Sequence, residues 1–332
     1  RFIMQTSRTD IRVMLNTMVL DISSQRVITA TAADGLKTIH AGAIVLAMGC
    51  RERTAGAIAV KGYRPTGVYT AGMAQRLMNM EGCRIGRDVV IYGSGDIGLI
   101  MARRMTLEGA NVKAVVEIMP FSSGLNRNIA QCLEDYGIPL LLSHTIGFIH
   151  GKQRLEGVTI AQIDARFKEI EGTHVYYPCD TLLLSVGLIP ENELSIKAGV
   201  PLDPITNGPT VDSTMQTGVP GIFACGNVLH VHDIVDFVTR ESRIAGKNAG
   251  LYALGAMPAP AFVPCQPARG IRYIMPQKVL TQNPDGANLF MRVDAVYQNV
   301  CIIVKSGSEV LAKKQAARMV PSEMITIPLK PE

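Results

Sequence analysis

The six residues GSGDIG, from Gly93 to Gly98, constrain the fold of this chain more than any other feature. They follow an apolar stretch at residues 88–92 and open a segment of helical character at residues 97–108. In this context, G-x-G-x-x-G predicts a strand, a tight turn and a helix whose N-terminus binds the pyrophosphate of a dinucleotide. Gly93 permits the turn, Gly95 lets the backbone approach the phosphates, and Gly98 lets the helix pack on the strand.

A second apolar strand, residues 111–117, ends in an acid, Glu117. A carboxylate at this place accepts hydrogen bonds from a ribose 2′-hydroxyl and repels a 2′-phosphate, which favours NAD over NADP. Asp96 suits a helix N-terminus, although its charge would stand near the pyrophosphate. A glycine turn without a ligand is the alternative, but strand, helix and acid together favour nucleotide binding. The predicted NAD-binding residues of this unit are Gly93, Ser94, Gly95, Asp96, Ile97, Gly98 and Glu117.

Strands and helices alternate after this motif, with a helix predicted at residues 125–136 and a strand at residues 139–144. Apolar strands in such an alternation are typical of a parallel sheet that is covered on both faces. Two further apolar strands end in glycine, AIVLAMG at 43–49 and GIFACGN at 221–227, and they flank the unit at 88–187. The sequence therefore predicts that this unit is inserted into another domain.

The segments LAMGCRER, GSGDIG, CDTLLLSVGLIPENEL and GVPGIFACGN occur in the order found in flavin-dependent members of the pyridine nucleotide–disulfide oxidoreductase family. The chain resembles this family over about residues 10–256. The resemblance implies an α/β, Rossmann-like architecture in which an NAD domain at 61–187 interrupts an incomplete FAD-type domain at 1–60 and 188–256. The alternating segment LFMRVDAVY and a hairpin turning at Ser306 and Gly307 predict a small all-β domain at 257–332.

The resemblance also implies a FAD site and one more residue of the NAD site. Asn227 stands where the family usually has Asp, and a turn-forming Asn is the alternative. A helix predicted at residues 239–254, with Thr239 as its cap, would aim its N-terminus at the flavin. Gly187 would lie on the nicotinamide side, or be a simple crossover glycine. The residues implied to contact FAD are Met48, Gly49, Gly226, Asn227 and Thr239.

Two departures from the family pattern affect function. No C-x-x-C pair occurs among the seven cysteines, so the sequence does not favour disulfide reduction. Between Arg1 and Ala41 there is a single glycine, Gly35, so the first FAD fingerprint of the family cannot be formed there. Either a preceding segment carries that fingerprint, or the chain does not bind FAD in the family's manner. The apolar strands that would line the first βαβ unit favour truncation.

The resemblance implies an FAD-dependent enzyme that transfers a hydride between NADH and FAD and exchanges electrons with a partner dehydrogenase subunit. The segments MGCRERTAG and CGNVLHVHDIVDFV resemble flavin subunits linked to sarcosine oxidase, proline dehydrogenase, opine oxidase and glycerol-3-phosphate dehydrogenase. The cofactors would supply the chemistry, so no catalytic side chain is predicted. A non-catalytic NAD-binding or assembly module, or a fragment without flavin, is the alternative. A plain NAD dehydrogenase acting on a small substrate is the third and last-ranked hypothesis, because no catalytic His/Lys/Tyr constellation is evident in the sequence.

Composition limits the partners. Trp is absent, only 5% of residues are aromatic and no run of like charge occurs, which argues against nucleic acid. No apolar run approaches the roughly 20 residues of a membrane span. The scattered single cysteines favour a cytoplasmic protein. His230 and His232 form an H-V-H pair beside Asp233, but no third soft ligand lies near in sequence and no metal is predicted. The C-terminal domain is expected to dock a partner subunit or to form an oligomer, and an unpartnered cap for the flavin domain is the alternative.

Overall fold

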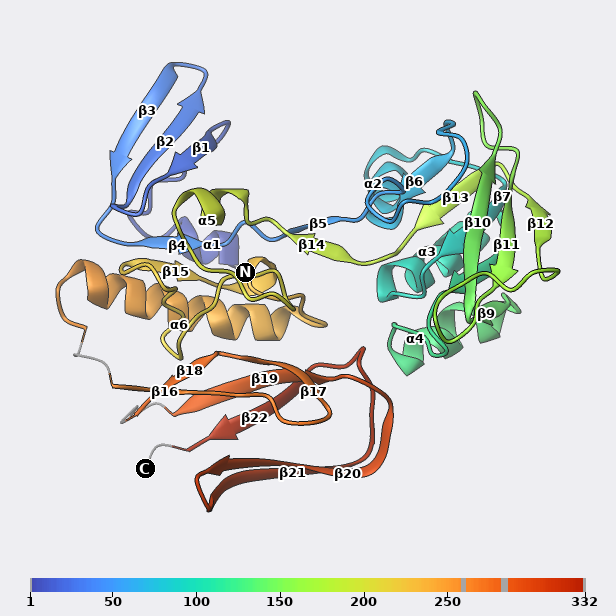
Figure 1. Ribbon diagram of the computed structural model, residues 1–332. Helices are drawn as coiled ribbons and strands as arrows, with labels where there is room; N and C mark the ends of the chain where they lie inside the picture. Colours follow the sequence, from blue (N-terminus) through green and yellow to red (C-terminus); the bar gives the residue numbers. More distant parts are fainter. Residues whose placement is uncertain (1, 258–260, 282–285, 331–332) are drawn as a thin grey trace.

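The computed structural model describes residues 2–257, 261–281 and 286–330. It shows an α/β unit on one side, joined by two crossing strands to a second unit, with the C-terminal strands packed beneath that second unit (Figure 1). None of the described helices combines the length and the apolar character that a membrane span requires.

The α/β unit is built on a five-stranded parallel sheet with the order β6-β13-β7-β8-β9. The predicted strands at 88–92 and 111–117 are confirmed with the same bounds, as β7 and β8. The strand that carries the glycine motif is therefore central, with a neighbour on each side. The strands are β6 (Val68–Thr70), β13 (Thr181–Leu184), β7 (Asp88–Tyr92), β8 (Asn111–Glu117) and β9 (Leu140–Leu142).

Both faces of this sheet are buried, because helices cover one face and an antiparallel sheet covers the other. Successive side chains of a strand point to opposite faces and therefore enter different cores. Val89 and Ile91 of β7 enter a core with the helices, whereas Val90 and Tyr92 enter a core with an antiparallel sheet. The predicted helix at 125–136 is divided, because a 3-10 turn, Glu134–Tyr136, follows α4. The covering elements are α2 (Ala71–Glu81), α3 (Asp96–Leu107), α4 (Asn126–Cys132), β10 (His144–His150), β11 (Gly157–Gln162) and β12 (Val175–Pro178).

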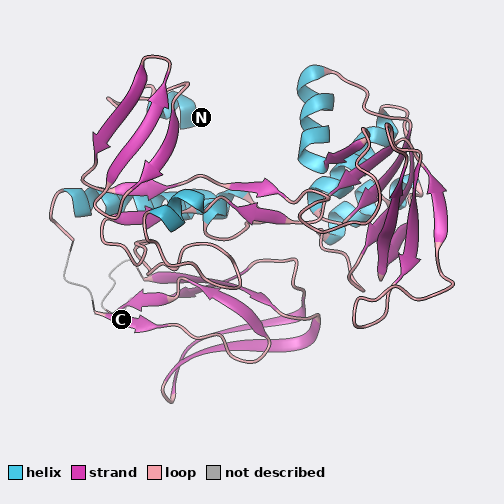
Figure 2. Cartoon of the chain, turned by 45° about the horizontal axis from the view of Figure 1, so that its top comes forward, coloured by secondary structure: helices cyan, strands magenta, loops and turns pink. Residues whose placement is uncertain are grey.

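The second unit contains the two other glycine-terminated strands. β4 (Ile44–Leu46) and β15 (Ile222–Ala224) pair in parallel, although 175 residues of sequence separate their bounds. β5 (Cys50–Glu52) and β14 (Leu188–Pro190) pair antiparallel and form the crossing between the units, which Figure 2 also shows. A three-stranded antiparallel sheet adjoins them, made of β1 (Met18–Ile22), β2 (Val27–Ala32) and β3 (Gly35–His40).

The long helix of the second unit, α6, covers Val235–Ala253. The predicted start at Thr239 is therefore wrong, because Thr239 lies inside the helix and its hydroxyl donates to the Val235 carbonyl at 3.0 Å. Asp236 in the first turn stabilises the true N-terminus through the helix dipole. The FAD contact assigned to Thr239 as a cap is corrected accordingly, since the helix N-terminus lies one turn earlier.

The predicted all-β character of the C-terminal region is confirmed for its described residues. The predicted hairpin turn is also confirmed, because Ser306 pairs with Glu309 across it. Met275 and Phe290 extend from this region into the core of the second unit, so the two parts share one apolar core. The strands are β16 (Phe262–Pro264), β17 (Ile271–Met275), β18 (Lys278–Leu280), β19 (Ala287–Val293), β20 (Tyr297–Ser306), β21 (Glu309–Met319) and β22 (Ile325–Leu329).

Candidate functional site

The glycine motif forms a tight turn between β7 and α3. Gly93 has φ +93°, a conformation that favours glycine, and a Cβ at this position would collide with the carbonyl oxygen of Ser185. A Cβ on Gly98 would come within 2.7 Å of the Ser185 Cβ, and one on Gly95 within 3.1 Å of the Ser185 Oγ. The glycines thus let the turn and the helix pack closely against the end of β13.

The first turn of α3 retains backbone donors for a ligand. The first helical hydrogen bond runs from Leu99 N–H to the Gly95 carbonyl, at 3.0 Å. Gly98 N–H donates to the Ser185 hydroxyl at 3.1 Å, which leaves the N–H groups of Asp96 and Ile97 without a partner among the described residues. Such free donors at the positive end of a helix form an anion site.

Glu117 lies at the end of β8 and is buried, with 4% of its surface exposed. Its Oε2 accepts from Ser94 N–H at 2.9 Å and from the Ser94 hydroxyl at 2.5 Å, while Oε1 accepts from Met119 N–H at 2.9 Å. The carboxylate therefore fixes the glycine turn to the end of the neighbouring strand. Its predicted hydrogen bond to a ribose remains a prediction.

The side chain of Asp96 turns toward the next helix. Its Oδ1 accepts from Leu125 N–H at 2.8 Å and from the Asn128 amide at 2.6 Å, where α4 begins. The structure thus gives this charge two donors and explains how an acid can occupy the first turn of α3. Ile97, next to it, is 37% exposed and lies beside the free donors.

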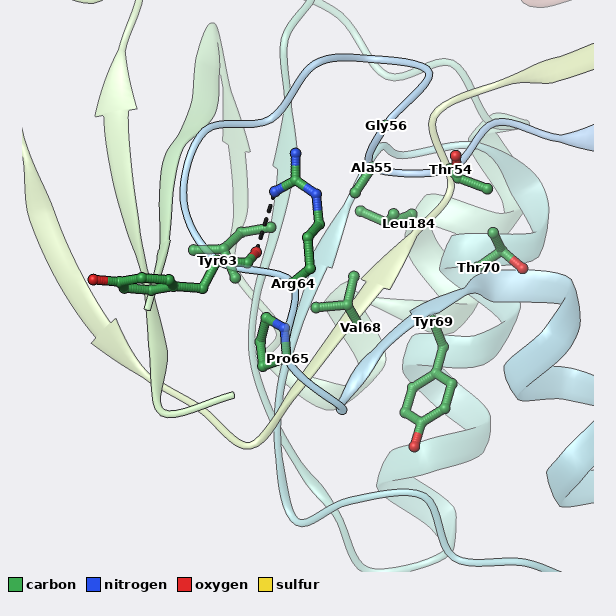
Figure 3. A pocket seen from close by; sticks show the side chains of 11 residues that line it. Thr54, Ala55, Gly56, Tyr63, Arg64, Pro65, Val68, Tyr69, Thr70 and Leu184 are labelled. Carbon is green, nitrogen blue, oxygen red and sulfur yellow. Dashed lines mark hydrogen bonds between the residues drawn. The ribbon is translucent and has the colours of Figure 1, made fainter. Parts of the chain in front are cut away.

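A cavity of about 260 Å³ opens at the carboxyl ends of β6 and β13 (Figure 3). Thr70 and Leu184, which end these strands, line it, and the Arg64 side chain is held there by the carbonyls of Gly62 and Tyr63, at 3.2 and 3.1 Å. Dinucleotides bind across the carboxyl edge of such a sheet, from one side of the glycine strand to the other. With Glu117 on the β8 side, this cavity lies on the side where the second nucleotide would bind.

Four of the residues implied to bind FAD, namely Met48, Gly49, Gly226 and Asn227, lie at the carboxyl ends of β4 and β15, whereas Thr239 lies inside α6. Gly49 has φ +74° and a Cβ there would meet nothing within 4 Å, so the strand end is open. Met48 is partly buried in the core, and the Gly226 N–H donates to Glu241 at 2.8 Å. The Asn227 side chain has hydrogen-bond partners within the protein: its amide contacts Cys50 Sγ at 3.6 Å, and its Oδ1 accepts from His232 N–H at 3.1 Å.

Gly187, the remaining predicted NAD residue, lies two residues after Ser185, whose carbonyl packs against the turn at Gly93. It has φ +101°, and its carbonyl accepts from Arg53 N–H at 3.0 Å on the crossing between the units. Its position fits a crossover glycine, and a contact with nicotinamide remains a prediction.

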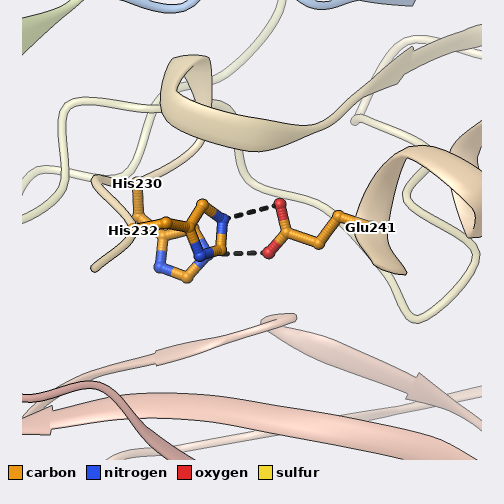
Figure 4. A group of neighbouring side chains, drawn as sticks. All are labelled: His230, His232 and Glu241. Atoms are coloured by element: carbon orange, nitrogen blue, oxygen red, sulfur yellow. Dashed lines mark hydrogen bonds and ion pairs between the residues drawn. The ribbon is translucent and has the colours of Figure 1, made fainter. Parts of the chain in front are cut away.

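His230 and His232 meet a buried carboxylate, Glu241 of α6 (Figure 4). Their Nε2 atoms lie 2.9 Å from its Oε1 and Oε2, respectively. The His230 Nδ1 lies 3.2 Å from the Tyr273 hydroxyl, which belongs to the C-terminal sheet. Burial alone would raise the pKa of Glu241, but the hydrogen bonds from both imidazoles lower it to about 2.

Burial lowers the pKa of His230, so this imidazole is neutral at pH 7. A neutral His230 that donates from Nε2 to Glu241 accepts at Nδ1 from the Tyr273 hydroxyl. The cluster therefore joins the late glycine strand, α6 and the C-terminal sheet through one hydrogen-bonded chain.

Sequence reasoning missed three contributors to these sites: Ser185, Glu241 and Tyr273. Ser185 follows the apolar strand TLLL directly, and a polar residue at a strand's carboxyl end was the signal available. Glu241 and Tyr273 lie 11 and 43 residues from His230 and reach it only through tertiary packing. No local spacing in the sequence marks them.

Comparison with known proteins places these features in one family. The model of the family "Pyridine nucleotide-disulphide oxidoreductase" matches residues 3–246. An NADH oxidase of Methanocaldococcus jannaschii is 30% identical over 193 residues, which cover 52% of this chain and 38% of that protein. An opine oxidase subunit of Agrobacterium tumefaciens is 23% identical over 243 residues, or 70% of this chain and 47% of that protein. The chain thus spans less than half the length of these two relatives.

Solved structures show the same fold. Thioredoxin reductase of T. acidophilum superposes with a TM-score of 0.57 at 24% identity, covering 73% of this chain and 74% of that one. The NAD-dependent persulfide reductase of A. fulgidus gives a TM-score of 0.59 at 21% identity, covering 88% and 51%. Since the family model matches well over half of the residues, the chain belongs to the pyridine nucleotide-disulphide oxidoreductase family, an enzyme family that uses FAD and NAD(P)H.

Proposed function

We propose that this chain is an NADH-dependent flavin oxidoreductase in which the GSGDIG turn binds NAD(H). The observation that carries the proposal is the pair of free N–H groups at Asp96 and Ile97, at the start of α3 on the central strand of a parallel sheet. These donors, together with the helix dipole, would hold the pyrophosphate. The acid at Glu117 supports NAD over NADP.

Each part of the NAD site has a physical role. Ser185 holds the Gly98 N–H and packs against the turn, so the helix N-terminus stays fixed before the ligand arrives. Glu117 holds the turn from the other side through Ser94. The cavity at Thr70 and Leu184 would receive the nicotinamide half and separate it from water. Preorganisation of this kind lowers the ordering cost of binding.

Some residues of the second unit fit a flavin. The open position at Gly49 and the N-terminus of α6 at Val235 would hold its ring system and its developing negative charge. FAD, when bound, would accept the hydride that NADH donates. Among residues 2–41, the described chain forms no glycine cradle for the FAD pyrophosphate, so we assign no residue to that part of the cofactor.

We expect Ile97→Glu to weaken NADH binding without destabilising the protein. A carboxylate beside the free donors would repel the pyrophosphate, and the expected loss of affinity is on the order of tenfold. The same acid would favour the helix N-terminus, so the thermal midpoint should not fall. NADH fluorescence titration and thermal unfolding measure the two effects.

Ile100→Glu is the matched control, because Ile100 is 42% exposed one turn further along α3. It should bind NADH as the wild type does. Equal affinity of both variants and the wild type would contradict a pyrophosphate site at this helix.

The flavin part of the proposal is tested by anaerobic visible spectroscopy of the protein supplied with FAD. A bound flavin band that NADH bleaches is expected if the second unit holds FAD within reach of the nicotinamide. A protein that binds NADH but retains no flavin would instead favour the alternative, a non-catalytic NAD-binding module. A spectrum unaffected by NADH, with no NADH binding in titration, would reject both.

We further propose that electrons pass between the flavin and a partner dehydrogenase subunit, of the kind linked to glycerol-3-phosphate dehydrogenase, sarcosine oxidase or proline dehydrogenase. The similarity to a protein named as one subunit of an opine oxidase supports this. In this proposal the domains are 1–60 with 188–256, 61–187, and 257–332, and the last of these docks the partner. Co-purification with a dehydrogenase subunit, lost when the exposed apolar residues Ile303 and Leu311 of β20 and β21 are replaced by lysine and thermal unfolding is unchanged, tests it.

A further inference from the structure

A second cavity lies where the crossing strand β14 meets the loop at 205–207 and the C-terminal strands β17 and β19. Its volume is about 260 Å³, which equals the space of about eight or nine water molecules in the liquid. Arg53, Arg272 and Arg292 line it, and none of the described residues that line it is acidic. This cavity shares none of its lining residues with the cavity at Thr70, and none of the GSGDIG residues lines it, so it is a distinct site.

Only one of the three arginines is neutralised. Arg292 pairs with Asp233 and also donates to the Val231 carbonyl at 3.0 Å, which fixes it in the wall. Arg53 and Arg272 are exposed and make no ion pair or side-chain hydrogen bond within the described chain. Arg51, two residues before Arg53, provides the contrast, because it pairs with two nearby glutamates.

The floor of the cavity adds polarity without negative charge. His230 and Tyr273 line it and hydrogen-bond to each other at 3.2 Å. The nearest buried acid, Glu241, lies behind His230 and receives its Nε2–H at 2.9 Å. The imidazole thus stands between the carboxylate and the cavity. The unpaired guanidinium groups of Arg53 and Arg272 therefore dominate the electrostatic field inside the cavity.

We infer that this cavity binds a small organic anion through Arg53 and Arg272, by way of a carboxylate or phosphate group. The planar guanidinium fork matches both groups in bidentate geometry. The volume suits a small metabolite and is below the usual range for a drug-sized ligand. The site requires neither NAD nor FAD.

Isothermal titration of the full chain with inorganic phosphate and with succinate, at constant ionic strength, tests this inference. Saturable binding of at least one probe with one site per chain is expected. Arg53→Gln and Arg272→Gln should each weaken it by about tenfold, because each removes one charge-assisted contact. Arg318→Gln is the matched control, since Arg318 is an exposed arginine on β21 away from the cavity, and it should bind as the wild type does.

Three results would overturn the inference. The first is no saturable binding of either probe by the wild type. The second is a loss of probe affinity in the Arg318→Gln variant that equals the loss in the two cavity variants, which would indicate general charge attraction. The third is displacement of phosphate by FAD one for one, with FAD affinity weakened in both cavity variants, which would assign the arginines to the flavin pyrophosphate. NADH titration of the same variants, expected to be unchanged, separates these results from failure of the NAD site.

Discussion

Replacing Gly93 by alanine is expected to destabilise the protein by about 3–5 kcal/mol and to abolish measurable NADH binding. The left-handed conformation costs a residue with a Cβ about 1–2 kcal/mol. The new Cβ would also collide with the Ser185 carbonyl, which is backbone at the end of β13 and cannot move as a side chain could. Relief of the collision would separate β7 from β13 at the nucleotide site. Chemical unfolding and NADH titration measure the two losses.

Gly109→Ala separates the two causes. Gly109 has φ +80°, similar to that of Gly93, but a Cβ there meets nothing within 4 Å. Only the conformational cost applies, so the expected loss is about 1–2 kcal/mol, with NADH affinity unchanged. If both variants lose the same stability, the contact between Gly93 and Ser185 does not constrain the turn.

Local patterns sufficed to predict the nucleotide-binding unit. β7 and β8 were predicted with their observed bounds, because each is an apolar run delimited by a polar residue and by a glycine or acid. Gly93 could be placed in a turn because it directly follows the apolar run of β7. The start of α6 was missed by four residues, since the first turn contains Val235, Phe237 and Val238, which have modest helix propensity.

Contacts between distant segments could not be predicted. Ser185 meets Gly98 across 87 residues, and Tyr273 meets His230 across 43. The sequence shows that both are polar, but their partners depend on which strands become neighbours. The unpaired state of Arg53 is likewise a tertiary property, because the nearby acids Glu191 and Glu193 pair with Arg51 instead.

The buried cluster at Glu241 provides the second large expected effect. Glu241→Gln should destabilise the protein by about 3–5 kcal/mol, since it leaves a buried hydrogen-bond network without its charge. The carboxylate accepts from His230, His232 and the Gly226 N–H. A glutamine side chain has one acceptor oxygen, and its amide would face an N–H donor. Glu108→Gln, at an exposed i,i+4 pair with Arg104, is the control and should change stability by less than about 0.5 kcal/mol.

The same cluster predicts how stability depends on pH. The folded pKa of Glu241 is about 2, below its ordinary value of 4.5. Ionised Glu241 therefore contributes about 3 kcal/mol to the free energy of unfolding above pH 4.5, and this contribution is lost as the pH falls toward 2. Burial also lowers the pKa of His230, so stability declines with falling pH below about 6.5 in wild type and variant alike.

Glu241→Gln should remove the steeper loss below pH 4.5 while keeping the decline that begins near 6.5. Free energies of unfolding, measured in denaturant between pH 7 and pH 3, distinguish the two segments of the curve. The difference between wild type and variant should be largest near pH 7 and should shrink as the pH falls below 4.5, because protonation then removes the same charge that the mutation removes. A difference that stays constant over this range would show that the carboxylate is not held ionised by the two histidines.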